Sequence, residues 1–204
     1  MTNVRCVSFT SRLALLLLAL AIPVRADTPP AGTASSFYDT LLAAMKQGPT
    51  LGFSGRRQLL EPEIRRDFNL PLMTRLVVGP AWRGLPADQQ QALVDAFSDF
   101  TIANYASQFR DFSGERFVVD PGATALPSGD VIVHSKLFTG DGGSVQLDYL
   151  MRNNAGNWQT IDVFLTGTIS ELAARRSEFS SVLRQGGPAA LIELLRKKTA
   201  ALGG

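Results

Sequence analysis

The sequence predicts an α+β fold with N-terminal helices, a four-stranded antiparallel sheet and C-terminal helices. Two observations lead to this fold class. Apolar residues recur at helical spacing up to about residue 110 and again after residue 170, whereas between residues 115 and 166 they alternate with a period of two. Glycine-containing turns separate the alternating segments, as in hairpins. Consecutive strands are therefore expected to form an antiparallel meander, with helices covering one of its faces.

Three short helices are predicted in the first part of the chain. The first extends from about Ser36 to Gln47 and is ended by Gly48-Pro49. Ser54 and Asn69 are residue types that cap helix N-termini, so they are expected to begin the second and third helices. Gly79-Pro80 ends the third.

A long helix is predicted from about Pro86 to Arg110. Its first half is apolar at Phe97 and Phe100, and its second half is apolar at Ile102 and Tyr105, on nearly the opposite side. A helix with two apolar sides needs two apolar neighbours. This helix is therefore expected to be sandwiched between other elements.

Four strands are predicted after the long helix, and the last two have clear apolar sides. Leu147 and Tyr149 lie on the apolar side of the third strand and Val163 on that of the fourth, whereas Asp148 and Asp162 follow the polar sides. The predicted strands are Glu115–Asp120, Asp130–Thr139, Ser144–Arg152 and Trp158–Thr166.

The C-terminal region is predicted to be helical. Thr168–Glu171 has the pattern of a capping box in front of an apolar run, which marks a helix start. Gly186-Gly187-Pro188 interrupts this helix, and a last helix extends to about Lys198.

The first 26 residues are predicted to be a cleavable export signal. Arg5 and Arg12 supply the positive start, residues 13–22 are apolar, and Val24-Arg25-Ala26 offers small residues for cleavage, so Asp27 is the expected mature N-terminus. Ten apolar residues are too few for a spanning helix, which needs ~20. An uncleaved membrane anchor, the alternative, is therefore less favoured.

Residues 27–35 are rich in proline, glycine and serine and are predicted to be a disordered leader, which leaves residues 36–204 as one domain. The signal contains three arginines and no acidic residue, so its removal leaves 17 Lys+Arg against 18 Asp+Glu. Such a balance argues against a nucleic-acid-binding protein, which needs a basic face. The single cysteine, Cys6, leaves with the signal, so the mature chain has no disulfide or thiolate.

The sequence offers few residues for catalysis or metal binding. His134 is the only histidine, sits within a predicted strand, and is interpreted as an exposed strand residue. No His or Cys cluster has metal-ligand spacing, and the glycine motifs of phosphate and dinucleotide loops are absent. We therefore expect no cofactor and no metal. Asp148 and Asp162 remain, either as an acid–base pair or, as we favour, in surface ion pairs with Arg175 or Arg176.

The periodicity of apolar residues does not decide whether the interior of the protein is solid or contains a cavity. An apolar sheet face opposite a helix that is apolar on two sides can enclose either a packed core or a ligand cavity, and on general grounds a packed core is commoner.

Several short phrases resemble those of one family in order and spacing. The central set consists of Asp67-Phe68, Met73–Gly79, Trp82-Arg83, Gln89 or Gln90, Phe97 and Tyr105-Ala106; the later set consists of Asp148-Tyr149, Trp158, Asp162-Val163, Gly167, Ser170 and Arg176-Ser177 with Phe179. In these phrases, between about residues 36 and 198, the chain is similar to the MlaC family of periplasmic lipid carriers, also called toluene-tolerance auxiliary proteins.

The chain departs from the family pattern at Arg175, where an aromatic residue is usual, and at Pro80-Ala81. The phrases Gly52–Arg56 and Thr168–Leu172 are more similar to a branch associated with hopanoid biosynthesis, often called HpnM. The resemblance therefore leaves a phospholipid and a hopanoid open as the lipid.

The resemblance implies a non-enzymatic periplasmic shuttle in an ABC-linked lipid transport system, with a curved sheet and helices enclosing an apolar cavity. Its implied partners are a lipid, an inner-membrane ABC transporter complex and an outer-membrane lipoprotein. Arg75 and Arg83 are candidates for contacts with a head group or a partner. The candidate lipid-binding residues are Leu72, Leu76, Trp82, Phe97, Tyr105, Leu147, Tyr149 and Val163.

Two rival functions come from other classes. One is a small periplasmic hydrolase or isomerase that uses Asp148 and Asp162 as its acid and base. The other is a protein-binding module that uses the long helix as its contact surface.

Overall fold

A computed structural model describes residues 29–203 of the chain. The predicted signal and its cleavage site before Asp27 lie outside these residues. The helices are α1 (Pro30–Lys46), α2 (Gly48–Asp67), α3 (Leu70–Val78), a 3₁₀ helix η1 (Gly79–Gly84), α4 (Ala87–Gln108) and α5 (Glu171–Leu202). The strands are β1 (Arg116–Ala125), β2 (Val131–Phe138), β3 (Ser144–Asn154), β4 (Asn157–Leu165) and β5 (Ile169–Ser170).

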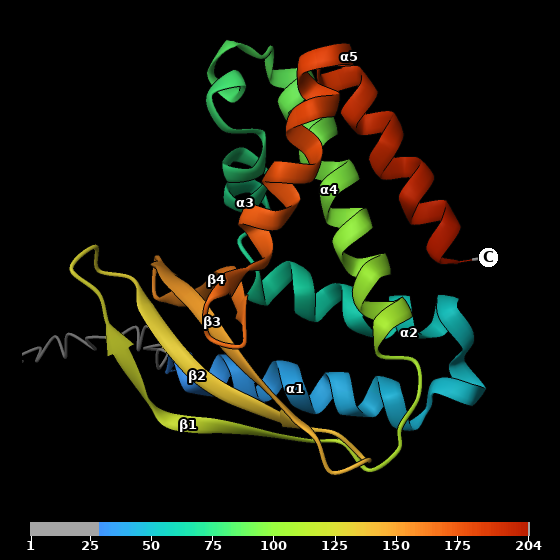
Figure 1. Cartoon of the computed structure of the whole chain (residues 1–204), viewed down its shortest axis with the longest axis vertical. Helices are drawn as coiled ribbons and strands as arrows, with labels where there is room; N and C mark the ends of the chain where they lie inside the picture. Colours follow the sequence, from blue (N-terminus) through green and yellow to red (C-terminus); the bar gives the residue numbers. More distant parts are fainter. Residues whose placement is uncertain (1–28, 204) are drawn as a thin grey trace, which may run out of the picture.

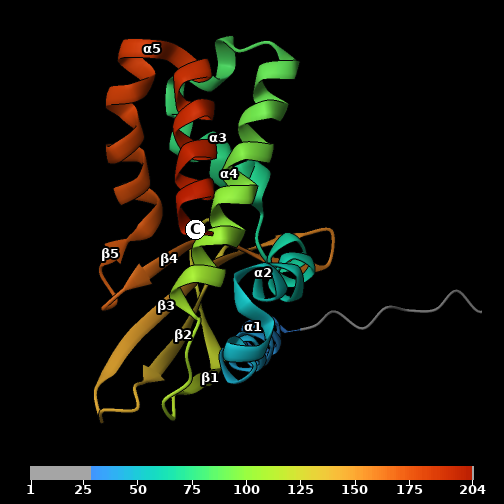
Figure 2. The ribbon, with the colours of Figure 1, turned by 90° about the vertical axis from the view of Figure 1, so that its right-hand side faces the viewer.

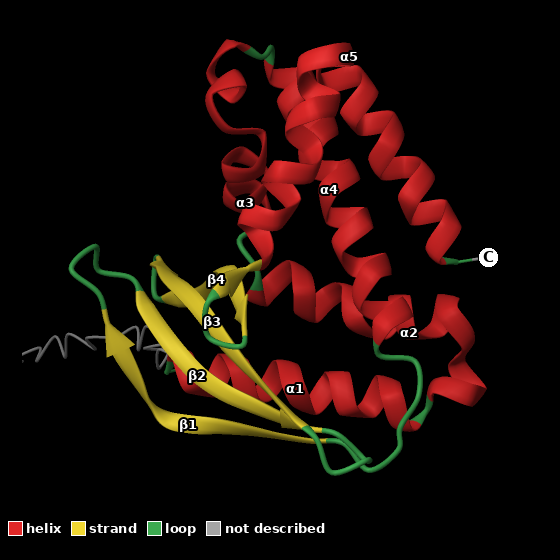
Figure 3. Cartoon of the chain, viewed as in Figure 1, coloured by secondary structure: helices red, strands yellow, loops and turns green. Residues whose placement is uncertain are grey.

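The strands form one antiparallel sheet in the order β1-β2-β3-β4-β5, which confirms the predicted α+β class and the meander (Figure 3). The difference is β5, a two-residue strand that pairs with the end of β4. It lies inside the segment predicted as a helix start, because the chain turns back on itself at Thr166-Gly167 before it becomes helical. Both residues of this turn have positive φ, 52° and 76°.

The first helix begins earlier than predicted. Residues 30–35, predicted as part of a disordered leader, form the first turns of α1. Pro30 stands at the helix start, where a proline costs no hydrogen bond. Thr33 and Ala34 are buried, so tertiary packing stabilises a segment whose composition alone suggested disorder.

The second helix also begins earlier than predicted. The first helix ends at Lys46, before Gly48-Pro49 as predicted, and Gly48-Pro49 then starts α2. A kink at Gly52, with φ of 60° and ψ of −173°, then separates this first turn from the rest of the helix. Asn69 caps α3 as predicted, because its side-chain oxygen accepts a hydrogen bond from Leu72 N at 3.1 Å.

The C-terminal helix bends where the sequence predicts an interruption. Gly187 has φ of 67° and ψ of −165°, so α5 consists of two arms (Figure 1). The N-cap of α5 is Ser170, whose hydroxyl accepts from Ala173 N at 2.9 Å. The predicted capping box from Thr168 to Glu171 is therefore wrong by two residues, and Glu171 is the first helical residue.

The molecule has two parts that share α4. Figures 1 and 2 show α3, α4 and α5 packed as an upright bundle, with the sheet and α1 at its base. Helix α1 lies along the sheet, where Tyr38 stacks on Phe117 of β1 with ring centroids 4.1 Å apart. Helix α4 packs against α2, α3 and α5, which confirms that it is sandwiched. None of the helices between residues 29 and 203 has an apolar stretch long enough to cross a membrane.

Candidate ligand-binding site

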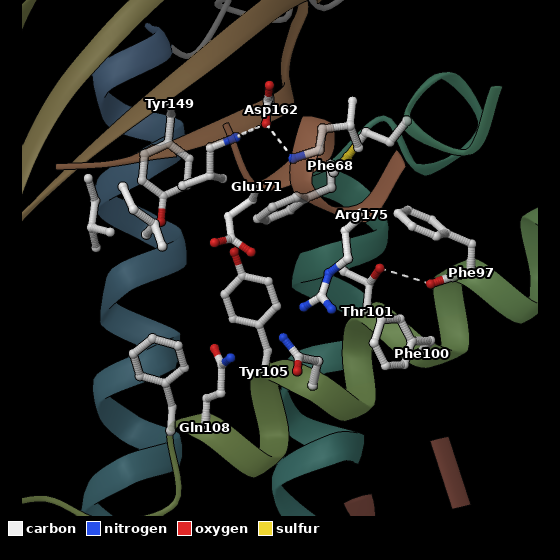
Figure 4. A pocket seen from close by; sticks show the side chains of 17 residues that line it. Phe68, Phe97, Phe100, Thr101, Tyr105, Gln108, Tyr149, Asp162, Glu171 and Arg175 are labelled. Carbon is white, nitrogen blue, oxygen red and sulfur yellow. Dashed lines mark hydrogen bonds between the residues drawn. The ribbon is translucent and has the colours of Figure 1, made fainter. Parts of the chain in front are cut away.

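A cavity of about 160 Å³ lies between α4, the covered face of β3 and β4, and the first turn of α5 (Figure 4). On a scale where about 10–15 Å³ holds one water molecule, it has room for on the order of ten. Its wall is formed by Phe68, Met73, Phe97, Phe100, Thr101, Asn104, Tyr105, Gln108, Phe109, Leu147, Tyr149, Asp162, Val163, Leu165, Glu171, Leu172 and Arg175.

One face of α4 supplies the helical wall. Its lining residues are spaced three and four apart, which places them on one side of the helix: Phe97, Phe100, Thr101, Asn104, Tyr105 and Gln108. The Thr101 hydroxyl donates to the Phe97 carbonyl at 2.8 Å, so it presents its methyl group without leaving a polar group unpaired. The buried residues Ile102 and Ala106 lie on the other side of the helix and do not line the cavity.

Aromatic rings in mutual contact build one wall of the cavity. Tyr105 meets Phe68 with ring centroids 5.6 Å apart and Phe37 with centroids 5.4 Å apart, both edge-on. Tyr105 also stacks on Phe109 at 5.8 Å. Such contacts fix ring orientation, so this wall is expected to keep its shape when the cavity is empty.

Three tyrosines lie together where the cavity meets α1. Burial raises the pKa of Tyr38 to about 12, and it raises the pKa of Tyr105 and Tyr149 further above the ordinary phenol value. All three are therefore protonated at neutral pH and can donate hydrogen bonds. The Tyr38 hydroxyl lies 2.6 Å from Ser135 Oγ, which itself donates to the Leu147 carbonyl at 2.5 Å.

Polar side chains gather at the more exposed side of the cavity. Asn104, Glu171 and Arg175 are half-buried and Gln108 is exposed, whereas Phe97, Phe100 and most of the other apolar lining residues are buried. Figure 4 shows the Glu171 carboxyl beside the Tyr105 hydroxyl, and Arg175, one turn later on the same helix, extended toward Thr101 and Phe100. The cavity thus has an apolar interior and a polar rim.

The cavity contains five of the eight predicted site residues. Phe97, Tyr105, Leu147, Tyr149 and Val163 line it.

The other three predicted site residues, Leu72, Leu76 and Trp82, lie outside the cavity wall. The buried face of α3 is formed by Leu70, Met73, Thr74, Val77 and Val78. Leu76 therefore points outward and is 41% exposed, and Leu72 is half-buried. Trp82 packs against the core from the 3₁₀ helix η1.

Sequence reasoning missed Glu171 and Arg175, which belong to the rim, and Phe68 and Phe100, which belong to the apolar wall. Phe100 follows Phe97 by three residues, so the helical spacing of α4 contained the signal for it. Glu171 was assigned to a cap instead, and its place in the cavity depends on where α5 begins.

Asp148 and Asp162 do not form an acid–base pair. Asp162 is opposite Leu150 in the sheet and Asp148 is opposite Phe164. The Asp162 carboxyl accepts from Leu172 N at 3.0 Å and from the Ser170 hydroxyl at 2.5 Å, so it holds the start of α5. No ion pair of either aspartate with Arg175 or Arg176 occurs among residues 29–203, so the favoured surface ion pair is also wrong.

His134 lies on β2 with its side chain 37% exposed, as predicted, but it also takes part in a polar network. Its Nδ1 lies 3.1 Å from Asp148 Oδ1, and its Nε2 lies 3.1 Å from Thr124 Oγ1. The Asp148 carboxyl, whose side chain is 8% exposed, also accepts from Gln146 at 2.9 Å. This network lies outside the cavity wall. Across residues 29–203, no three His, Cys, Asp or Glu side chains are placed to share a metal ion.

The fold and the site define an α+β protein in which a sheet and helices enclose an apolar cavity with a polar rim. The family model for the MlaC protein matches residues 35–197, and the chain belongs to this family. No curated protein matches the chain.

Among solved structures, the chain is similar to the phospholipid-binding protein from Ralstonia solanacearum, determined in complex with a phospholipid. The two chains are 24% identical with a TM-score of 0.74, and the match covers 86% of this chain and 99% of that one. This likeness shows that they share a fold.

Proposed function

We propose that this protein binds a lipid in the cavity between α4 and the sheet and carries it across the periplasm. The observation that carries the proposal is the polarity of the cavity: buried aromatic and aliphatic side chains form its interior, and Asn104, Gln108, Glu171 and Arg175 form its rim. An amphiphile would place its acyl chain inside and its head group at the rim. Membership of the MlaC family and the phospholipid bound by the Ralstonia protein support the same function.

The energetics favour a carrier. Each buried CH₂ group contributes ~0.8 kcal/mol, so a sixteen-carbon chain gains about 13 kcal/mol on leaving water for either a bilayer or an apolar cavity. Transfer between membrane and protein is then nearly balanced, whereas free diffusion through water is strongly disfavoured. Contacts with docking partners can therefore set the direction of transfer.

The cavity must open to take up a whole lipid. A volume of about 160 Å³ accommodates only part of a lipid with two long chains. The first arm of α5 is suited to move, because it adjoins the cavity at Leu172 and Arg175 and lies between the positive-φ glycines Gly167 and Gly187. Its displacement would enlarge the cavity and leave the α2–α4 contacts in place.

The export signal and the partners belong to the same proposal. A signal over residues 1–26 would deliver one mature domain to the periplasm, where an inner-membrane ABC transporter complex and an outer-membrane lipoprotein would load and unload it. The lipid is a phospholipid or a hopanoid. The separate hydrogen-bonding roles of Asp148 and Asp162 favour a binding protein over a hydrolase.

Native mass spectrometry of the protein purified from a periplasmic extract tests lipid binding. We expect a mass increment that disappears on delipidation, and a phospholipid or hopanoid in the organic extract. A protein with no lipid adduct that also fails to load from vesicles would contradict the proposal.

N-terminal sequencing of the periplasmic protein tests export separately. The mature chain is expected to begin at Asp27. Recovery of the protein only in the membrane fraction, with its first residues intact, would show an uncleaved anchor instead.

A further inference from the structure

The Glu171 carboxyl is unusual among the buried and half-buried acidic groups of the sheet and α5. Asp130, Asp148 and Asp162 each have a cation or hydrogen-bond donors within 3.1 Å. Between residues 29 and 203, Glu171 has neither an ion pair nor a side-chain hydrogen bond. Its side chain lines the cavity, and its charge helps to raise the pKa of Tyr105 (Figure 4).

This free carboxyl follows from the way α5 begins. Ser170 and Asp162 accept the first backbone N–H groups of the helix, from Ala173 and Leu172. Glu171 is therefore not needed as a cap, although an acidic residue is well suited to this end of a helix. Its carboxyl remains available to a ligand.

Arg175 supplies the opposite charge one turn later. It lines the same cavity, and its guanidinium lies over the Phe100 ring, 5.0 Å from the ring centroid. Its one ion pair is a long contact of 3.5 Å with Glu178. Stacking on Phe100 holds the guanidinium in place and leaves its N–H groups able to donate to an acceptor in the cavity.

The two charged side chains are complementary to a zwitterion. Residues four apart on a helix face lie ~5–6 Å apart at their Cβ atoms. Glu171 and Arg175 are not joined to each other by an ion pair, so each can interact with a ligand group of opposite charge. The uncharged amides of Asn104 and Gln108 complete the rim and can pair with either half of such a ligand.

We propose that the rim of the cavity selects a lipid with a zwitterionic head group, whose phosphodiester binds Arg175 and whose ammonium binds Glu171. This inference rests on the proposed lipid binding and adds its chemical selectivity. A lipid with only anionic groups would place an acceptor beside the Glu171 carboxylate. A lipid with no phosphate would leave Arg175 without a ligand partner.

Loading from mixed vesicles tests this selectivity. Delipidated protein is incubated with vesicles that contain equal amounts of phosphatidylethanolamine, phosphatidylglycerol and diacylglycerol with identical acyl chains. The protein is then separated, and its lipids are extracted and quantified by mass spectrometry. We expect wild type to take up phosphatidylethanolamine at least threefold over phosphatidylglycerol.

Two variants test the roles of Glu171 and Arg175 separately. Glu171→Gln should bring the ratio of phosphatidylethanolamine to phosphatidylglycerol close to that of the vesicles. Arg175→Met should lower the ratio of both phospholipids to diacylglycerol at least threefold. Matched controls are the same changes at exposed positions of α5, Glu193→Gln and Arg184→Met, which should leave both ratios unchanged.

The outcomes distinguish this inference from the function on which it rests. Wild type that loads lipid at the vesicle ratio, or a Glu171→Gln protein that keeps the wild-type ratio, would overturn the selectivity and leave lipid binding intact. An equal change in Glu193→Gln would overturn it as well. Wild type that takes up no lipid from any vesicle would overturn both.

Discussion

Helix α4 separates two apolar regions of the molecule that are filled in different ways. On one side it packs with α2 and the second arm of α5, through aliphatic residues that are 0 or 1% exposed, including Leu60, Ile64, Leu93, Leu191 and Leu195. On the other side it faces the sheet across the cavity, where six of the lining residues are aromatic.

The difference follows from side-chain shape. Flexible, branched aliphatic chains interdigitate and leave few voids. Rigid rings that contact one another edge-on support each other and can border an open space. The helical bundle therefore provides stability, and the aromatic side provides the cavity.

A matched pair of leucine truncations tests this contrast and has the largest expected effect. Leu93 is fully buried outside the cavity and Leu147 forms part of its wall. Leu93→Ala should lower the free energy of unfolding by about 2–5 kcal/mol, because it leaves a new void in a packed region. Leu147→Ala should cost less than half as much, because its contacts are already incomplete on one side.

Urea unfolding of both delipidated variants measures the difference. Equal decreases in the free energy of unfolding would mean that the two regions are packed alike, which would contradict the proposed difference between them.

Asp162→Asn tests the junction between the two regions, with a smaller expected effect. The substitution removes the charge that accepts from Leu172 N and the Ser170 hydroxyl at the start of α5. We expect a loss of about 1–2 kcal/mol, typical of a helix cap with charged hydrogen bonds. Thermal unfolding measures the loss, with the exposed Asp120→Asn as control. Lipid content should be largely unchanged; an intact fold with no lipid would indicate a direct role for Asp162 in binding.

Asp130 provides a test in the turn that precedes β2, outside the cavity wall. Arg152 donates to both oxygens of this carboxyl, at 2.7 and 2.8 Å, and holds its pKa below the ordinary value. Because the folded-state pKa is the lower one, the pair stabilises the protein above the unfolded pKa of ~3.9 and loses this contribution as the pH falls through the folded pKa.

Asp130→Asn should therefore cost about 1 kcal/mol at pH 7 and progressively less below pH ~4. Urea unfolding at a series of pH values measures this. A difference between wild type and variant that is independent of pH would show that the ion pair is not its source.

Much of the fold could be predicted from the sequence because most elements satisfy local rules. The apolar alternation placed Leu147, Tyr149 and Val163 on the covered face of the sheet, and the two apolar sides of α4 predicted its sandwiched position. Errors occurred where tertiary contacts override local signals. Burial of Thr33 and Ala34 extends α1 into a segment of loop-like composition.

The site could be predicted only in part. Its strand residues followed from alternation, but Leu76 was misplaced because α3 is apolar on more than one side and only packing selects the buried one. Glu171 was missed because the start of α5 depends on Asp162, nine residues earlier in the chain. Whether the interior is open depends on how the side chains fit together, which periodicity does not describe.

Val163→Trp has the smallest expected effect on stability and the most direct bearing on the contrast. Val163 lies on the cavity wall, pairs with Tyr149 across β3 and β4, and is 8% exposed. In a packed core the added indole would cost ~1–3 kcal/mol through overpacking. In the cavity it should occupy the space meant for the acyl chain, so the delipidated variant is expected to unfold within about 1 kcal/mol of wild type. The same variant should take up little lipid from vesicles.

Stability and lipid uptake are both measured on this one variant, and a cavity and a packed core predict opposite results. A cavity predicts a stable protein without lipid, whereas a packed core predicts a destabilised protein. A Val163→Trp protein that is stable and still carries lipid would show that the acyl chain binds elsewhere. The aromatic side of α4 would then support the fold, as the aliphatic side does.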